Sequence, residues 1–135
     1  MHGATTNGNK MILHIAKINT TFGKVLTSNR VMMNLESINE KEFFPGVFGR
    51  FVHGEKLSWA FWRVEKDAEV PLHHHIHEQM MHVVSGEFQF ELDGKSIHCK
   101  TGDIVVIPSN VPHFGKALTD CQLMDVFTPA RDEYR

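Results

Sequence analysis

A dense group of histidines is the feature of this sequence that most directly suggests chemistry. Ten histidines occur in 135 residues, and five lie within ten residues of one another: His73, His74, His75, His77 and His82. Neutral imidazole nitrogens are good ligands for first-row divalent metal ions. The group is internal and lies in a strand-like pattern, whereas an affinity tag is normally terminal and uninterrupted. A metal site is therefore our first hypothesis.

The spacing within residues 73–79 indicates which side chains could share an ion. In a β-strand, side chains two residues apart lie on the same face. One face of such a strand carries His73, His75, His77 and Gln79. We predict that His73 and His75 bind the metal and that Gln79 adds an amide oxygen. His77 is either a hydrogen-bond donor beside the site or a residue that lines the pocket, because one ion cannot easily take three consecutive residues of one strand face.

A further ligand has to come from a distant part of the chain, and His113 is the obvious supplier. It follows the turn at residues 108–112, and a hairpin that begins at Gly102 could return it across a barrel. The alternative is a solvated patch of histidines with adventitious metal affinity. The remaining histidines, taken singly, are expected to be packed or hydrogen-bonded; these are His14, His53, His82 and His98.

Short strands separated by turns must position these residues. In residues 87–92, Phe88, Phe90 and Leu92 alternate with polar residues, and Asp93-Gly94 then supplies a two-residue hairpin turn. Residues 58–64 alternate in the same way, with Trp59, Phe61 and Arg63 on one side and Ala60, Trp62 and Val64 on the other.

Turn signals recur every eight to twelve residues from Phe43 onward, and no long helical pattern interrupts them. This pattern predicts an all-β sandwich or barrel of antiparallel strands. It includes a buried strand from Ile104 to Ile107 and a final strand in residues 121–129.

The N-terminal part differs from the rest and predicts a short, poorly defined extension over residues 1–40, before one domain over residues 41–135. Residues 11–18 could form a short strand or a helical turn. Ser37 with Glu40 resembles a capping box, which predicts a short helix that begins there.

Composition excludes several classes of partner. The hydrophobic fraction of 41% suits a globular domain, and a formal net charge of −2 gives no basic field for nucleic acid or an acidic membrane surface. The apolar stretch at residues 11–18 is too short and too polar to span a bilayer. Cys99 and Cys121 form no CxxC pair and are expected to be reduced, so we expect a cytoplasmic protein.

Two segments resemble the paired motifs of the cupin family. HHHIHEQMMHVVSG resembles the first motif: HxH, three residues, Glu or Gln, six residues, and Gly86. GDIVVIPSNVPH resembles the second, with Gly102, Pro108 and then His113. The resemblance implies a double-stranded β-helix or jelly-roll barrel that holds one divalent metal ion through His73, His75, Gln79 and His113. Asn110 replaces a common Gly, and Asn tolerates the left-handed conformation that this turn needs.

The metal itself stays open among zinc, nickel, manganese, iron and copper. Gln79 stands where many cupins have Glu, which removes one negative charge and weakens the case for a His3Glu iron dioxygenase.

The C-terminal segment LMDVFTPARDEYR resembles that of the pectin-degradation cupins, which linearise 4,5-unsaturated monouronates. This resemblance implies that Asp125, Phe127 and Arg131 contact the substrate or take part in catalysis. If Asp125 faces an apolar interior, burial raises its pKa and suits it to proton transfer, while Arg131 could hold a substrate carboxylate. The alternative is an Asp125–Arg131 ion pair that only fixes the C-terminal tail.

Three functions follow as hypotheses. The first is a metal-dependent lyase or isomerase that opens the ring of a carboxylated sugar. The others are a metal-dependent dioxygenase or isomerase of another small molecule, and a non-enzymatic sugar-binding or sensing module. Because edge strands of a small barrel need cover, we also expect a homodimer.

Overall fold

The computed structural model describes residues 32–135, which fall into two units that meet between Ser37 and Ile38. In the first unit, the 3₁₀ turn η2 (Leu35–Ser37) is capped by the side chain of Asn34, whose Oδ1 accepts a hydrogen bond from the backbone N–H of Glu36 at 2.9 Å. The predicted helix beginning at Ser37 is wrong, because Ser37 ends this turn and Asn34 supplies the cap. The predicted element at residues 11–18 lies outside the described residues.

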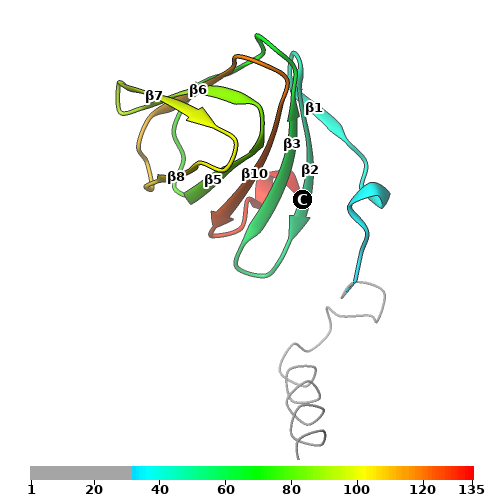
Figure 1. Cartoon of the computed structure of the whole chain (residues 1–135). Helices are drawn as coiled ribbons and strands as arrows, with labels where there is room; N and C mark the ends of the chain where they lie inside the picture. The colour runs from blue at the N-terminus through cyan, green and yellow to red at the C-terminus, as the bar shows by residue number, and fades with distance from the viewer. Residues whose placement is uncertain (1–31) are drawn as a thin grey trace, which may run out of the picture. The chain divides into compact units, whose positions relative to one another are not determined.

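The second unit contains ten strands in two antiparallel sheets that curve around a common interior (Figure 1). The six-stranded sheet has the order β1 (Lys41–Phe44), β2 (Val47–His53), β3 (Ser58–Val64), β10 (Cys121–Thr128), β5 (Glu78–Ser85), β8 (Ile104–Ile107). The four-stranded sheet has the order β4 (Glu69–His73), β9 (His113–Ala117), β6 (Glu87–Leu92), β7 (Lys95–Lys100). The all-β prediction is confirmed, and β1 begins at Lys41. The division into an extension and one barrel domain stays a prediction.

The β6–β7 hairpin forms where the sequence predicts it. Leu92 pairs with Lys95, and the two residues between them have positive φ angles, 50° for Asp93 and 73° for Gly94. Phe88 and Phe90 are buried, while the polar residues that alternate with them, Glu87, Gln89 and Glu91, are less buried. Hydrophobic alternation and turn chemistry therefore fix this hairpin together.

The two sheets bury a core between their inner faces. Its members are mostly aliphatic or aromatic: Val47, Val64, Met81, Val83, Phe88, Phe90, Cys99, Ile107, Ala117, Cys121 and Leu123. The alternation predicted for β3 is confirmed, because Ala60 and Val64 are buried and Trp59 and Arg63 are exposed. Cys99 and Cys121 are both buried, free thiols. Among residues 32–135, no helix is long and apolar enough to cross a membrane.

Two strand predictions need correction. Residues 73–79 do not form one strand: β4 ends at His73 in one sheet and β5 begins at Glu78 in the other, with a bend between them. The predicted alternation nevertheless continues through the bend, since His74, Ile76 and Glu78 are exposed. The chain crosses between sheets here, which periodicity alone does not reveal.

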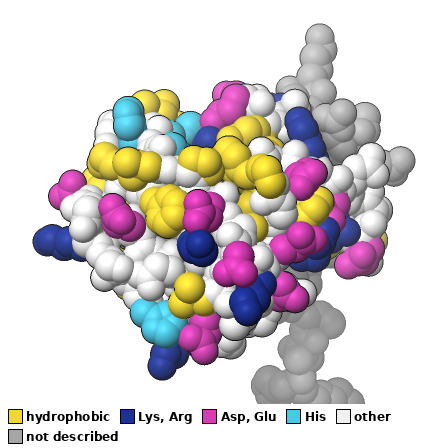
Figure 2. All heavy atoms as spheres, turned by 90° about the horizontal axis from the view of Figure 1, so that it is seen from above, with side chains coloured by type: hydrophobic (Ala, Val, Ile, Leu, Met, Phe, Trp, Pro, Cys, Tyr) yellow, Lys and Arg dark blue, Asp and Glu magenta, His cyan; other side chains and the backbone are white. Residues whose placement is uncertain are grey.

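The strand from Ile104 to Ile107 is not buried as predicted. It forms β8, the edge of the six-stranded sheet, and only Ile107 is fully buried, whereas Ile104 and Val106 are exposed. A run of four apolar residues predicts burial on both faces, but an edge strand covered on one face can carry the same run. Figure 2 shows one face of the molecule on which hydrophobic side chains reach the surface beside charged ones.

Candidate metal centre

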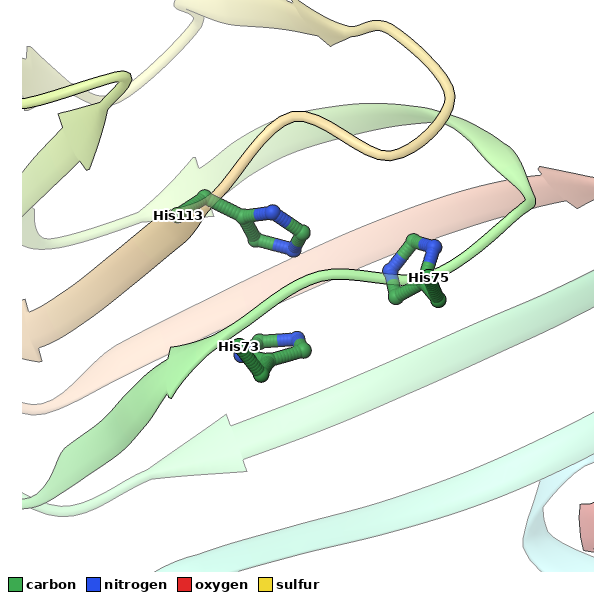
Figure 3. Close-up of side chains that lie close together, drawn as sticks. All are labelled: His73, His75 and His113. Atoms are coloured by element: carbon green, nitrogen blue, oxygen red, sulfur yellow. The ribbon is translucent and has the colours of Figure 1, made fainter.

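Three histidines from two distant parts of the chain, His73 and His75 from one and His113 from the other, lie close together (Figure 3). His73 is the last residue of β4 and His113 the first of β9, and the two are direct partners in the β4–β9 register. His75 lies in the bend after β4. One nitrogen from each ring lies within 4.8 Å of those of the other two, so the three side chains are positioned to hold one metal ion. Their meeting depends on the β4–β9 pairing within the four-stranded sheet and not on a β8–β9 hairpin, since β8 and β9 lie in different sheets.

Backbone carbonyl groups orient all three rings in the same way. The Nδ1 atoms of His73, His75 and His113 lie 2.7, 3.0 and 2.8 Å from the carbonyl oxygens of Pro71, His77 and Val111. Each Nδ1 therefore carries the proton and donates, which assigns the lone pair to Nε2. Nε2 of His113 is buried and has no hydrogen-bond partner among residues 32–135. This donor set fits a metal ion, because ligand histidines typically donate their other N–H to a carbonyl or carboxylate.

Burial keeps the three imidazoles neutral. It lowers the pKa of His73 and His113 below the ordinary value, and lowers that of His75 to about 4. The positive charge of Arg131 acts in the same direction on each of them. Near pH 7 the lone pairs are therefore available to a metal ion without loss of a proton.

Gln79 lies beside this group, on the inner face of β5. Its Oε1 lies 3.2 Å from Nε2 of His75. With Nδ1 of His75 protonated, both atoms as assigned are acceptors, and a cation between them would make this separation favourable. Ligand atoms about 2.1 Å from one ion are roughly 3.0–3.4 Å apart in octahedral or tetrahedral geometry. The observed separation fits Gln79 as a fourth ligand, which stays a prediction.

His77 contributes through its backbone. Its carbonyl oxygen accepts the Nδ1–H of His75, so it helps to orient a ligand ring. The His77 side chain is buried, its Nδ1 has no hydrogen-bond partner within the described part of the chain, and it does not belong to the converging group.

A cavity of about 90 Å³ is lined by His73 and His113, and Asp125 of β10 also lies in its wall. Asp125 is buried, and its Oδ2 accepts a hydrogen bond of 2.8 Å from the indole N–H of Trp62. Its Oδ1 meets no partner at normal hydrogen-bonding distance within residues 32–135. Burial raises the pKa of Asp125 to about 7, against smaller opposing effects of the Gln79 amide, the Trp62 indole and the Arg131 charge. A carboxyl group in this state can both take up and release a proton near neutral pH.

Arg131 enters the same cavity from the C-terminal segment, just before η3 (Asp132–Tyr134). Its guanidinium carbon lies 4.9 Å from the centre of the Phe127 ring and 4.7 Å from that of Tyr134. Nε pairs with Glu133 at 2.5 Å and Nη2 donates to the Tyr134 hydroxyl at 3.2 Å, while Nη1 makes no hydrogen bond with residues 32–135. The side chain is thus tied to its own segment and not to Asp125, contrary to the ion pair considered from the sequence.

The sequence does not predict that Trp62 and Tyr134 line the cavity. Alternation places Trp62 on the inner face of β3, but its contact with Asp125 requires the β3–β10 register, in which Asp125 faces Ala60. Tyr134 lies in a three-residue turn with no periodic signal. It is held by aromatic contacts with Phe43 and Phe51 and by its backbone oxygen, which lies 3.1 Å from Nε2 of His53.

Two curved antiparallel sheets with three converging imidazoles define a β-barrel with a candidate metal site. Residues 60–127 match the family model described as Cupin domain, which covers half of the chain. The chain belongs to this family. A comparison with curated proteins gave no match.

Solved structures of other cupins have the same fold. A RmlC-like cupin from Shewanella frigidimarina is 28% identical, with a TM-score of 0.74 over 77% of this chain and 95% of its own. KdgF from Halomonas sp. is 29% identical, with a TM-score of 0.71 over 76% of this chain and 96% of its own. The cupin domain of Cnp3 from Schizosaccharomyces pombe, at 12% identity and a TM-score of 0.64 over 73% and 74%, shows the shared fold alone.

Proposed function

We propose that this chain is a metal-dependent enzyme that opens the ring of a 4,5-unsaturated uronate, a small carboxylated sugar. The observation that carries the proposal is a buried carboxyl group, Asp125, with a free oxygen in a cavity that His73, His113 and Arg131 also line. The resemblance of the C-terminal segment to the pectin-degradation cupins supports the substrate class. The likeness to KdgF from Halomonas sp. is consistent with it.

The dimensions of the cavity favour a small substrate. A single water needs a cavity volume of roughly 10–15 Å³ on the same measure. A cavity of about 90 Å³ therefore has room for a ligand the size of several water molecules. A monosaccharide suits this volume, and a polymer could enter only by its end. Arg131 supports a negatively charged substrate, because Nη1 has no protein partner and can donate to a carboxylate.

Ring opening requires one proton to move twice. The hydroxyl on C1 loses its proton, the C1–O5 bond breaks, and C1 becomes an aldehyde. The enolate left at C5 becomes a ketone when C4 gains a proton, so the product is an isomer of the substrate. Asp125 takes up the first proton at Oδ1 and returns one for the second step, since its pKa of about 7 suits both directions.

The remaining residues bind and orient the substrate. Arg131 holds the carboxylate, and Phe127 packs beneath the guanidinium and against His75, with ring centres 5.8 Å apart in the latter pair. His73, His75, Gln79 and His113 would hold the metal ion. When bound, a divalent ion supplies Lewis-acid polarisation of a substrate oxygen.

The proposal is tested by incubating the metal-loaded protein with a 4,5-unsaturated uronate and following the absorbance of the conjugated double bond. We expect the absorbance to fall, and to persist when the metal is removed by a chelator. Asp125→Asn, which keeps the shape of the side chain, should abolish the loss while the bound metal remains, as elemental analysis would show.

Asp67→Asn is the matched control. It makes the same chemical change at an exposed position whose φ of 68° Asn adopts readily, so activity should be unchanged. A fully metal-loaded parent protein that leaves the chromophore intact would contradict the proposal. Oxygen uptake by the ferrous protein would favour an oxygenase instead, and saturable binding without turnover would favour a sugar-binding module.

A further inference from the structure

Tyr134 is the only tyrosine of the chain, and it lines the same cavity as Asp125 and Arg131. Nη2 of Arg131 donates a hydrogen bond of 3.2 Å to its hydroxyl oxygen, and its ring centre lies 4.7 Å from the guanidinium carbon. A phenylalanine at this position would make the same ring contacts. The hydroxyl group therefore needs an explanation of its own.

The hydroxyl proton of Tyr134 points away from Arg131. A guanidinium carries only N–H donors, so the Tyr134 oxygen is the acceptor in this hydrogen bond and its own proton is directed elsewhere. That proton meets no acceptor among residues 32–135. Because Tyr134 forms part of the cavity wall, its proton is available to a ligand in the cavity.

Arg131 alone offers a limited grip on an anion. Its Nε pairs with the Glu133 carboxylate and Nη2 donates to Tyr134, so Nη1 is the nitrogen left without a partner in the described part of the chain. The negative charge of Glu133 also offsets part of the positive charge of the guanidinium. A second donor close to Nη1 would therefore strengthen the binding of an anion.

The backbones of Arg131 and Tyr134 are tied to one pair of side chains, Ser58 and His53. The N–H of Arg131 donates to Oγ of Ser58 at 2.8 Å, and this Oγ lies 2.8 Å from Nδ1 of His53. Nε2 of His53 lies 3.1 Å from the backbone oxygen of Tyr134, which can only accept, so Nε2 carries the proton and Nδ1 accepts that of Ser58. These bonds hold the two residues in place before any ligand binds, which lowers the cost of binding one.

We propose that Tyr134 is a substrate-binding residue whose hydroxyl group donates a hydrogen bond to the substrate carboxylate, while the other carboxylate oxygen accepts from Nη1 of Arg131. Nη1 and Nη2 share one carbon atom, so Nη1 and the Tyr134 oxygen are near enough for one carboxylate to accept from both. The identity of the substrate rests on the proposed function, but the ring-opening step does not enter.

Two donors side by side also select among sugars. A carboxylate brings two acceptor oxygens and no proton, which matches them. The hydroxymethyl group of a neutral sugar brings one oxygen and a proton of its own, so it leaves one donor unpaired. A site built of hydrogen-bond donors rejects a ligand that cannot pair with them. Tyr134 is therefore expected to set the preference for a carboxylated sugar.

The test is calorimetric binding to the metal-loaded full chain, with D-galacturonate and D-galactose as probes. These sugars differ only in their carboxylate and hydroxymethyl groups. We expect the parent to bind galacturonate at least about tenfold more tightly than galactose. Tyr134→Phe keeps the ring and removes the hydroxyl group, so it should weaken galacturonate binding about tenfold, the worth of a hydrogen bond to a charged group, and leave galactose binding unchanged.

Ser96→Ala is the matched control. It also removes a hydroxyl group that accepts a hydrogen bond from a side-chain nitrogen, here Nε2 of Gln89, but at an exposed position outside the cavity wall. Its affinity for galacturonate should equal that of the parent. Fluorotyrosine incorporation labels Tyr134 alone, and its single fluorine resonance should shift with galacturonate and not with galactose. Elemental analysis and circular dichroism verify that each variant is metal-loaded and folded.

Equal affinities of Tyr134→Phe and the parent for galacturonate would overturn this inference, and so would a parent that does not prefer galacturonate to galactose. Turnover of the unsaturated uronate is measured separately. If the chromophore is lost but galacturonate binding ignores Tyr134→Phe, the reaction stands and the role of Tyr134 falls. If the chromophore persists while galacturonate binding depends on Tyr134, the carboxylate site stands and the reaction falls.

Discussion

Trp62 positions the carboxyl group of Asp125 through a single hydrogen bond from its indole N–H. Its ring fills the space over Gly49, where a Cβ would lie 2.5 Å from the indole, so the ring has little freedom to turn. We expect Trp62→Phe to keep the packing and lose this bond. Under the proposed function, kcat should fall about tenfold, the worth of a hydrogen bond to a charged group, with little change in KM. Steady-state kinetics with the unsaturated uronate would measure this.

Trp59→Phe gives the control for that prediction. It makes the same change on the same strand, but Trp59 faces outward and is 41% exposed. Both kinetic constants should be unchanged by it. Equal losses in the two variants would show that Trp62 acts only through the stability of β3.

The three converging histidines should be individually necessary for metal binding. Replacing His73, His75 or His113 with Ala removes a ligand whose orientation depends on its own backbone acceptor. Affinity should fall by at least about a hundredfold, which elemental analysis of protein purified without an affinity column would detect as loss of the ion. His74→Ala is the control, since His74 is exposed and lies outside the converging group. Equal metal content in His74→Ala and His73→Ala would contradict the assignment.

Sequence spacing predicts which histidines converge, because the two cupin motifs place His73 and His113 at ends of strands that pair directly. It does not predict which nitrogen faces the ion. That choice depends on the carbonyl oxygens of Pro71, His77 and Val111, which lie in the irregular end of β4, in the bend after it and in the turn before β9. The same limit applies to Arg131, whose pairing with Glu133 depends on the turn at η3.

At the scale of elements, the turn at Gly86 between β5 and β6 should be the least tolerant of change. Gly86 has a φ of 93°, and a Cβ there would lie 2.4 Å from the backbone oxygen of Asp120. Gly102 has nearly the same φ, 95°, but a Cβ would meet nothing within 4 Å. We expect Gly102→Ala to lower the free energy of unfolding by about 1 kcal/mol through conformation alone, and Gly86→Ala by about 3 kcal/mol.

Urea unfolding of the two variants measures this difference under one set of conditions. The comparison isolates the steric contact, because backbone strain is common to both positions. If the two losses of stability were equal, the chain around Asp120 would have to move aside at little cost, and the contact at Gly86 would not limit this turn.

Local signals determine some elements fully and others only in part. The β6–β7 hairpin needs only the alternation from Phe88 to Leu92 and the Asp93-Gly94 turn, which agree with each other. The bend at residues 74–77 and the edge position of β8 depend on which sheet each strand joins. The exposure of Ile104 and Val106 is a property of that edge, and their apolar character predicts only that something covers them.

For the whole molecule, buried groups around the cavity impose opposite dependences of stability on pH. The folded pKa values of His73, His75 and His113 lie below the ordinary value of 6.5, so their contribution is present above pH 6.5 and is lost as pH falls. The folded pKa of Asp125, about 7, lies above its ordinary value of 3.8. Its contribution is complete below pH 3.8 and is lost as pH rises to 7, because the buried carboxyl must then ionise.

Asp125→Asn separates these two effects in the metal-free protein. The amide stays neutral at every pH, so the variant keeps the histidine dependence and loses that of the carboxyl group. Between pH 5 and 7, the free energy of unfolding of Asp125→Asn relative to the parent should rise by about 2–3 kcal/mol, at 1.36 kcal/mol for each pH unit. Urea unfolding after treatment with a chelator measures this slope, and any fixed cost of the amide beside Trp62 cancels from it. Parallel pH profiles for the two proteins would mean that Asp125 is already ionised at pH 5, and the proton transfer proposed for it would lose its physical basis.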